Sequence, residues 1–166
     1  MVSCGDADGA VTGNTRRYGA SLEKIKKVID PRPGEIMFGL NMIVSKGKTV
    51  FVGDTSVHEY PSSEQLAEIA ISSARVVRLF GFDPKVAFVS HSTFGQPLTS
   101  RTKHIKNAVD ILKEKNVDFM FDGDMQPDVA LNEQYKELYP FSNIVGNANI
   151  LIMPGQHSAA ISYKMM

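Results

Sequence analysis

Apolar residues recur at helical spacing in several segments of this chain. The first predicted helix has an apolar stripe that Asp30-Pro31 ends, formed by Leu22, Ile25, Val28 and Ile29. The second begins where Ser62 and Gln65 have the spacing of a capping box. Similar spacing predicts a third helix over residues 98–115, and we expect a shorter one over residues 127–139.

Short apolar runs between these helices predict strands. Only Lys46-Gly47-Lys48 separates the runs at residues 35–45 and 49–53, so we expect an antiparallel hairpin there. Further buried strands are expected over residues 86–89, 119–121 and 149–153. Helices and strands therefore alternate with short connections, which is typical of a three-layer α/β/α fold with a mostly parallel sheet. The hairpin makes the predicted sheet mixed.

Composition places the chain among ordinary globular proteins. Its 166 residues fit a single α/β domain over residues 1–166, and 43% of them are hydrophobic while 22% are charged. The 18 basic and 18 acidic residues cancel, so we expect neither nucleic acid nor an anionic membrane surface as a partner. No apolar run approaches the roughly 20 residues that a membrane-spanning helix needs.

The single cysteine, Cys4, excludes an internal disulfide and favours a reducing compartment. The first residues have neither the basic start nor the apolar stretch of a signal peptide, so we expect a cytoplasmic protein. Cys4 is interpreted as a small buried residue, with a nucleophile as the alternative.

Both ends of the chain suggest a piece of a longer protein. The sequence enters a polar loop at residues 5–13 with no element before it, and it stops at residues 162–166 inside an apparent helix without a stop signal. We therefore expect one domain excised from a larger chain.

Polar loops follow the predicted strands or open the predicted helices, at residues 5–9, 90–95, 122–128 and 154–158. Phe119 to Phe121 reads as a strand that breaks at Gly123, which would put the acidic residues after it just beyond its end. Because the carboxyl ends of parallel strands share one edge of a sheet, the last three loops should gather there. The ligand-cleft candidates in the four loops are Asp6, Asp8, Ser90, His91, Ser92, Thr93, Asp122, Asp124, Gln126 and His157.

Several of these side chains have a structural alternative. Asp6 and Asp8 are also suited to turns and helix caps. His157 is either a ligand contact or a histidine bonded to backbone at a helix start. The other histidines considered, His58 and His104, are interpreted as surface residues.

The remaining polar pairs do not identify a reaction. His91 and Ser92 are adjacent, but a catalytic base must reach its nucleophile in space, and no nucleophile elbow is present. Asp122 and Asp124 alone are a thin ligand set for magnesium, so we expect no metal site in this chain.

Several motifs together resemble phosphate acetyltransferases, in that family's order and over nearly the whole chain. They are Gly5–Gly9 with Thr12-Gly13, Phe121–Gln126, Asp128–Leu131 and Gly146–Leu151. Other segments resemble the phosphotransacetylase-like C-terminal region of large bacterial NADP-dependent malic enzymes, namely Thr15–Tyr18, Ser90–Gly95, Tyr139–Ser142 and Met153–Ala159. At residues 91–95, active acetyltransferases tend to have a Phe-Ser-Thr-Lys-Gly type of loop instead.

The resemblance implies an isocitrate/isopropylmalate dehydrogenase-like fold of two α/β domains, of which this chain would be the second. It also implies that the Ser-Arg motif tied to acetyl transfer lies beyond Met166, so we expect no catalytic residue in this chain. NADP and a divalent metal would bind elsewhere in a parent malic enzyme. In that branch the region looks like a regulatory module that binds acetyl-CoA and favours the less active state. The family further implies a homodimer.

Three hypotheses follow. The first is a regulatory, acetyl-CoA-sensing and subunit-associating domain of an NADP-dependent malic enzyme, with no cofactor of its own. The second is a domain of an active phosphate acetyltransferase, which converts acetyl-CoA and phosphate to acetyl phosphate and CoA. The third is a dimerisation module without catalysis. In the first two, acetyl-CoA or a related small molecule would bind together with the missing domain.

Overall fold

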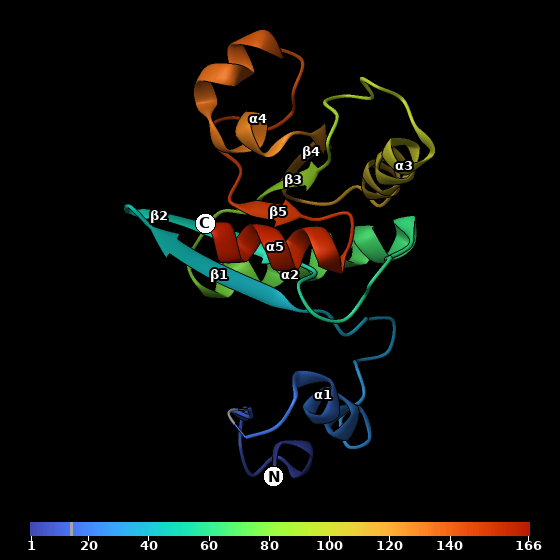
Figure 1. The fold of residues 1–166 in the computed structure, drawn as a ribbon, viewed down its shortest axis with the longest axis vertical. Coiled ribbons are helices and arrows are strands. Elements are labelled where there is room, and N and C mark those ends of the chain that lie inside the picture. The colour runs from blue at the N-terminus through green and yellow to red at the C-terminus, as the bar shows by residue number, and fades with distance from the viewer. Residues whose placement is uncertain (14) are drawn as a thin grey trace. The chain divides into compact units, whose positions relative to one another are not determined.

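The computed structural model describes residues 1–13 and 15–166, and for Lys136 the backbone alone. The chain divides into two compact units, Met1–Glu35 and Ile36–Met166. In the smaller unit the structure has the 3-10 helix η1 (Val2–Cys4) and the helix α1 (Tyr18–Lys26). The sheet belongs to the larger unit (Figure 1). The single α/β domain expected over residues 1–166 stays a prediction.

The described part of the larger unit contains a five-stranded sheet in the order β1-β2-β5-β3-β4. The strands are β1 (Leu40–Ser45), β2 (Lys48–Gly53), β3 (Lys85–Val89), β4 (Met120–Met125) and β5 (Ile150–Ile152). The hairpin is antiparallel, with Ile43 opposite Val50, and all other neighbouring strands run parallel. The predicted mixed and mostly parallel sheet is confirmed.

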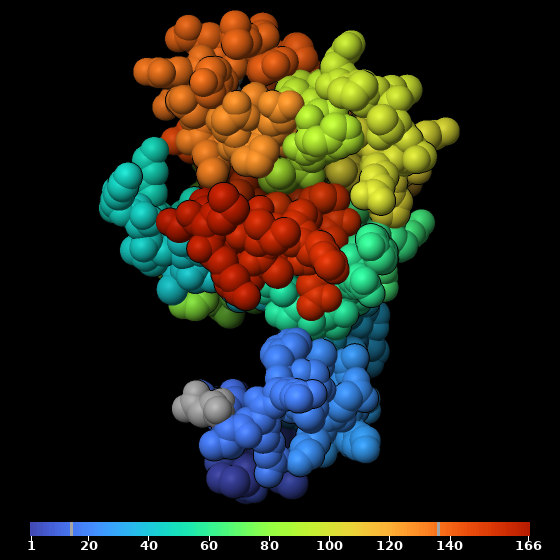
Figure 2. Space-filling view, in the orientation of Figure 1, coloured from blue at the N-terminus to red at the C-terminus, as the bar shows by residue number. Residues whose placement is uncertain are grey.

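Helices cover both faces of this sheet. Alternate strand residues point to opposite faces, and Phe51 and Phe88 pack with α2 (Ser63–Leu79) and α3 (Ser100–Glu114). On the other face, Val52 and Val89 pack with α4 (Pro127–Leu131) and α5 (Gln156–Met165). The two apolar clusters thus form the cores of a three-layer α/β/α arrangement, as predicted. Figure 2 shows α5, in red, at the surface of the larger unit.

Local signals located the start of α2 correctly. Ser62 accepts a hydrogen bond from the Gln65 N–H, and the Gln65 side chain accepts one from the Ser62 N–H, which is the predicted capping box. A second capping box, between Thr99 and Thr102, opens α3. The inward residues of α3 are Ile105, Ala108, Val109 and Leu112.

Several element boundaries differ from the prediction, and two of the differences have a clear local cause. The first helix ends at Lys26, because a tight turn brings the Val28 N–H onto the Ile25 carbonyl and leaves the Val28 side chain exposed. The strand predicted from residue 35 begins only at Leu40, since the Gly39 N–H bonds to an Asp54 carboxylate oxygen instead of a neighbouring strand.

The helix predicted over residues 127–139 is interrupted. Asn132 has extended backbone angles between α4 and the 3-10 helix η2 (Glu133–Leu138). Its side-chain oxygen accepts a hydrogen bond from the Gln134 N–H at 3.1 Å, which caps the new turn. Asparagine commonly competes with helix continuation in this way.

Candidate functional site

The carboxyl ends of four parallel strands share one edge of the sheet, and the loops after them meet there. The Ser90 N–H donates to the Met125 carbonyl at 2.9 Å, and Gln126 Nε2 donates to the His91 carbonyl at 2.9 Å. The loops after β3 and β4 therefore come together as predicted. The loop after β5 is joined to the connection after β2, through the Gln156 N–H and the Glu59 carbonyl.

A buried polar cluster holds the loop after β3 in place. The Ser92 hydroxyl donates to Asp124 Oδ2, and the Gly95 N–H donates to Asp124 Oδ1 at 2.9 Å. Ser90 and Ser92 hydroxyls are 3.2 Å apart, and Thr93 accepts from the Gln126 N–H. These polar atoms are satisfied by one another, so Ser90, Ser92, Thr93 and Asp124 position the loop.

The expectation that Asp122 and Asp124 follow a strand is wrong, because both lie inside β4 and are buried. Gly123 between them has a φ of 152°, and a Cβ there would come within 2.7 Å of the Phe88 Cβ. The sequence Asp-Gly-Asp thus marks a close approach of two strands instead of a turn. Asp122 Oδ2 accepts the Asn143 N–H at 2.7 Å, which fixes the following segment.

The other candidates are at the surface. His91, Gln126 and His157 are exposed residues of the larger unit, and Asp6 and Asp8 are exposed residues of the smaller one. Asp122 and Asp124 line one cavity of the larger unit. Among the described residues that line a second cleft of this unit, His157 is the one sequence candidate.

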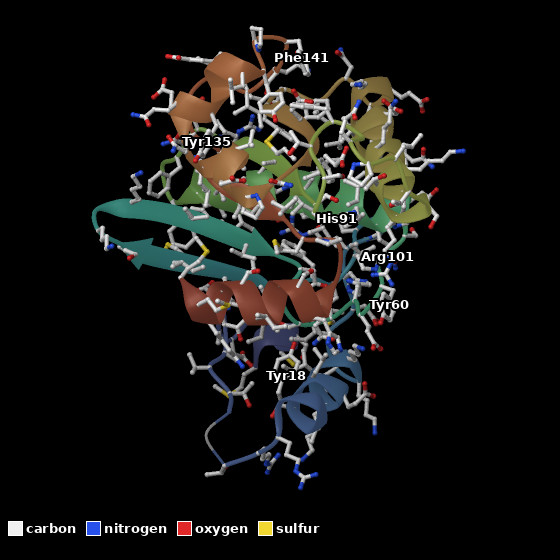
Figure 3. The ribbon with its side chains drawn as sticks, turned by 45° about the horizontal axis from the view of Figure 1, so that its top comes forward. Tyr18, Tyr60, His91, Arg101, Tyr135 and Phe141 are labelled. Atoms are coloured by element: carbon white, nitrogen blue, oxygen red, sulfur yellow. The ribbon has the colours of Figure 1, made fainter. Side chains whose placement is uncertain are left out.

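This cleft has a volume of about 690 Å³. It is lined by residues 59–62 and 65, by Ser100, Arg101, His104 and Ile105, and by residues 154, 155, 157 and 158. It therefore lies where the starts of α2, α3 and α5 converge. Figure 3 shows Tyr60 and Arg101 on the side of the larger unit where α5 begins.

The cleft is suited to an anion. Helix starts carry unpaired N–H groups and a partial positive charge, and Arg101 makes no ion pair with any residue in the described ranges. Glu59 adds a negative charge at the rim. The sequence analysis did not select Tyr60, Arg101 and His104 as site residues. The signal that could have located them is the pair of capping residues Ser62 and Thr99, because each marks the start of a helix that follows a strand.

Both histidines interpreted as surface residues are half-buried and make hydrogen-bonding contacts instead. His58 Nδ1 lies 2.7 Å from Asp54 Oδ2, and the His58 side chain is 17% exposed. His104 Nε2 lies 2.8 Å from the Pro61 carbonyl oxygen. Each histidine holds part of the connection between β2 and α2, which forms one wall of the cleft.

Two titratable groups near these helices have shifted pKa values. The Ser62 hydroxyl donates a hydrogen bond to the Glu64 carboxylate at 2.7 Å and lowers the pKa of that carboxyl. The nearby His104 contributes a smaller lowering of the same pKa. At the other end of α2, Arg78 bonds to Asp118 at 3.0 Å and lowers the pKa of that carboxyl. Both residues are exposed.

The described residues show neither a metal-binding cluster nor a membrane-spanning helix. Over residues 1–13 and 15–166, no three His, Cys, Asp or Glu side chains gather as a metal ion requires. None of the described helices is long and apolar enough to cross a membrane. Cys4 was expected to be buried, but it is exposed. It lies in η1 of the smaller unit, which has no buried residue.

Comparison with known proteins identifies the family. The family profile described as phosphate acetyl/butaryl transferase matches residues 1–166. The chain belongs to this family. The fold agrees, since a phosphotransacetylase titled EutD from Staphylococcus aureus superposes with a TM-score of 0.87 at 29% identity, over 99% of this chain and 52% of that one. A phosphotransacetylase from Streptococcus pyogenes gives a TM-score of 0.88.

The curated relatives include both malic enzymes and phosphate acetyltransferases. An NADP-dependent malic enzyme of Rhizobium meliloti is 48% identical over 166 residues, which are 100% of this chain and 22% of that protein. A phosphate acetyltransferase of Buchnera aphidicola is 31% identical over 99% of this chain and 23% of that protein. The chain therefore matches the phosphotransacetylase-like region of NADP-dependent malic enzymes, and it spans about a fifth of the length of these relatives.

Proposed function

We propose that this chain acts in an NADP-dependent malic enzyme, which oxidatively decarboxylates malate to pyruvate, as a regulatory region that senses acetyl-CoA and associates subunits. The 48% identity to a malic enzyme, against 31% to a phosphate acetyltransferase, is the observation that carries this proposal. NADP and a divalent metal would bind in another region of the parent protein. We propose a cytoplasmic location, as the single cysteine favours.

The cleft supports the acetyl-CoA part of the proposal. Acetyl-CoA carries several phosphate groups, and three helix starts with Arg101 offer donors and positive charge to such groups. Because Arg101 is the only arginine among the described lining residues, the cleft is better suited to binding than to stabilising a phosphoryl-transfer transition state. The partner domain that the family implies would supply the opposite wall.

Calorimetric titration with acetyl-CoA tests this binding. We expect Arg101→Gln to weaken binding about tenfold, because a buried or partly buried charged hydrogen bond contributes roughly 1.5 kcal/mol or more. Lys103→Gln, on the same helix but outside the cleft lining, should leave the affinity unchanged. Equal affinities for both variants would contradict the assignment of the cleft, and malate oxidation that does not respond to acetyl-CoA would contradict the regulatory role.

The second candidate is an active phosphate acetyltransferase. The likeness to solved phosphotransacetylases over 99% of this chain favours it. The discriminating measurement is formation of acetyl phosphate from acetyl-CoA and inorganic phosphate, without malate. Turnover in that assay, together with no malate oxidation, would replace the first candidate with the second.

We also propose that the protein forms a homodimer through β1. This strand lies at the edge of the sheet, and Met42 and Val44 on it are 49% and 67% exposed. Open edge strands with apolar residues favour pairing with another strand. Light scattering at a protein concentration on the order of tens of micromolar should give the mass of a dimer. The Val44→Lys variant should shift the measured mass toward that of a monomer. A monomer in the unmodified protein would contradict this proposal.

A further inference from the structure

Another cavity of the larger unit lies at the opposite edge of the sheet from the cleft. It has a volume of about 520 Å³, and Lys48 and Asn149, which line it, stand at the amino ends of the neighbouring parallel strands β2 and β5. The cleft instead follows the carboxyl ends of these strands. Met166, directly after α5, also lines this cavity, and Figure 1 shows that end of the chain, marked C, beside β2. We call it the amino-edge cavity, and none of its described lining residues lines the cleft.

The walls of the amino-edge cavity are largely apolar. Ile43 and Val50 lie opposite each other in the hairpin and belong to the apolar packing between the sheet and the helices α4 and α5. Leu131, Ala148 and Met166 add further apolar side chains. A volume of several hundred Å³ with apolar walls and a few polar groups is typical of a site for a small molecule. The cavity therefore favours a ligand with an apolar body.

Two lysines bring positive charge to this cavity. Lys46 and Lys48 lie at the turn of the hairpin and are among the lining residues. Side chains alternate along a strand, so Lys48 points to the same face of the sheet as Val50, two residues further on. Neither lysine makes an ion pair with any residue in the described ranges. Since no Asp or Glu is among the described residues that line the cavity, an anionic head group would provide the missing partner.

An asparagine in the lining has an unused hydrogen-bond acceptor. The Oδ1 atom of Asn147 is buried and has no hydrogen-bond partner among the described residues. The Asn149 side chain, in contrast, accepts from the Lys85 N–H and donates to the Asp83 carbonyl, both at 2.8 Å. Buried polar atoms rarely lack a partner. The Asn147 side chain is only half-buried, so rotation of its amide can turn the oxygen toward a donor in the cavity.

We propose that the amino-edge cavity binds a small amphipathic anion whose apolar body carries a hydrogen-bond donor, as in a medium-chain hydroxy acid. The body lies along the apolar walls, the anionic head group lies at Lys46 and Lys48, and the donor binds Asn147. The site uses none of the residues of the cleft. This inference therefore goes beyond the proposed function and does not depend on it.

Calorimetric titration of the full-length protein at neutral pH tests the class of ligand. Octanoate and 3-hydroxyoctanoate differ only in one hydroxyl group, and octylamine places a positive charge on a chain of the same length. We expect 3-hydroxyoctanoate to bind about fivefold more tightly than octanoate, because it adds one hydrogen bond. Octylamine should bind about tenfold more weakly than octanoate, or less, since it meets two lysines. Octyl phosphate distinguishes a phosphate from a carboxylate head group, and tighter binding of either anion supports the proposal.

A pair of double variants tests the position of the head group. Lys46→Gln combined with Lys48→Gln should weaken octanoate binding roughly tenfold, because two modest ion pairs are lost together. Lys103→Gln combined with Lys106→Gln is the matched control, since it removes the same charge from α3, outside the described lining of this cavity. The control should leave the affinity unchanged. Equal losses in the two double variants would show a general attraction of charge and would overturn the site.

The Asn147→Ala variant tests the donor separately. It should remove the preference for 3-hydroxyoctanoate and leave the affinity for octanoate unchanged, which also shows that the cavity is intact. If the unmodified protein binds the two acids equally, water satisfies Asn147 and the assigned donor is wrong. If neither acid binds, or if octylamine binds as tightly as octanoate, the whole proposal fails. The binding of acetyl-CoA to the cleft affects none of these outcomes.

Discussion

Asp54 provides the sharpest test of how the edge of the sheet is held together. It directly follows β2, and its carboxylate is 2% exposed. Oδ1 accepts the N–H groups of Gly39, Ser56 and Val57 at 2.7, 2.8 and 3.2 Å. Oδ2 accepts the His58 N–H at 2.8 Å and faces His58 Nδ1 at 2.7 Å. One side chain therefore organises the connection that leads to the cleft.

Asp54→Ala leaves these donors without a partner in a buried site. Each hydrogen bond to a charged group contributes roughly 1.5–3 kcal/mol, but water reaches some freed donors, so the contributions do not add. Removing one member of a buried charged network lowers stability by about 3–5 kcal/mol, and we expect a loss in this range. Asp54→Asn should lower stability by less than Asp54→Ala does, because the amide keeps one accepting oxygen. It should still be less stable than the unmodified protein, because the amide points donors at the His58 N–H.

Urea unfolding at pH 7, followed by far-ultraviolet circular dichroism, measures these losses. The expected loss for Asp54→Ala corresponds to a fall in the thermal midpoint of roughly 6–20 °C. The exposed Asp83 provides the matched control, and Asp83→Asn should change the free energy of unfolding by less than about 0.5 kcal/mol. If Asp54→Ala changed it by less than about 1 kcal/mol, the hydrogen bonds to this carboxylate would not hold the connection as argued.

Two further predictions test other parts of the larger unit. Gly123→Ala should lower stability by about 2–4 kcal/mol in urea unfolding, because the new Cβ meets Phe88 and the φ of 152° is strained, whereas Gly19→Ala, in open space on α1, should not lower it. Ser62→Ala should remove the cap of α2, at about 0.5–2 kcal/mol, and raise the pKa of Glu64 toward its ordinary value in a carboxyl NMR titration. The pKa of Glu64 is lower in the folded protein than in the unfolded chain. The carboxylate therefore stabilises the fold above its unfolded pKa, and this stabilisation is lost as the pH falls through its folded pKa. The loss in acid should be smaller in Ser62→Ala. An unchanged Glu64 titration would contradict the assigned cause.

Patterns within a few residues predicted the parts of the fold that local contacts determine. The hairpin followed from a three-residue separation, and the start of α2 followed from Ser62 and Gln65, whose partners are each other. The order of elements was enough to predict parallel strands with helices on both faces. These predictions required no knowledge of contacts between residues that are distant in the sequence.

The acidic residues were misjudged because their partners are distant in sequence. Asp124 bonds to Gly95, 29 residues away, and Asp122 bonds to Asn143, 21 residues away. No local pattern distinguishes a carboxylate with such partners from one in an open turn. His104 was misjudged for the same reason, since its partners Pro61 and Ser63, at the start of α2, are more than 40 residues away.

These corrections change the electrostatic picture of the site. Asp54 and Asp124 stand at the carboxyl ends of different strands, and each accepts donors from the loops around it. Each carboxylate is therefore bound by donors of the scaffold itself, although Asp124 also lines a cavity of the larger unit. The cleft itself is built from helix starts, with Arg101 and His104 on one wall. An edge that looks acidic in sequence thus presents a cleft with helix starts and an arginine, which favour anions, as the proposed binding of acetyl-CoA requires.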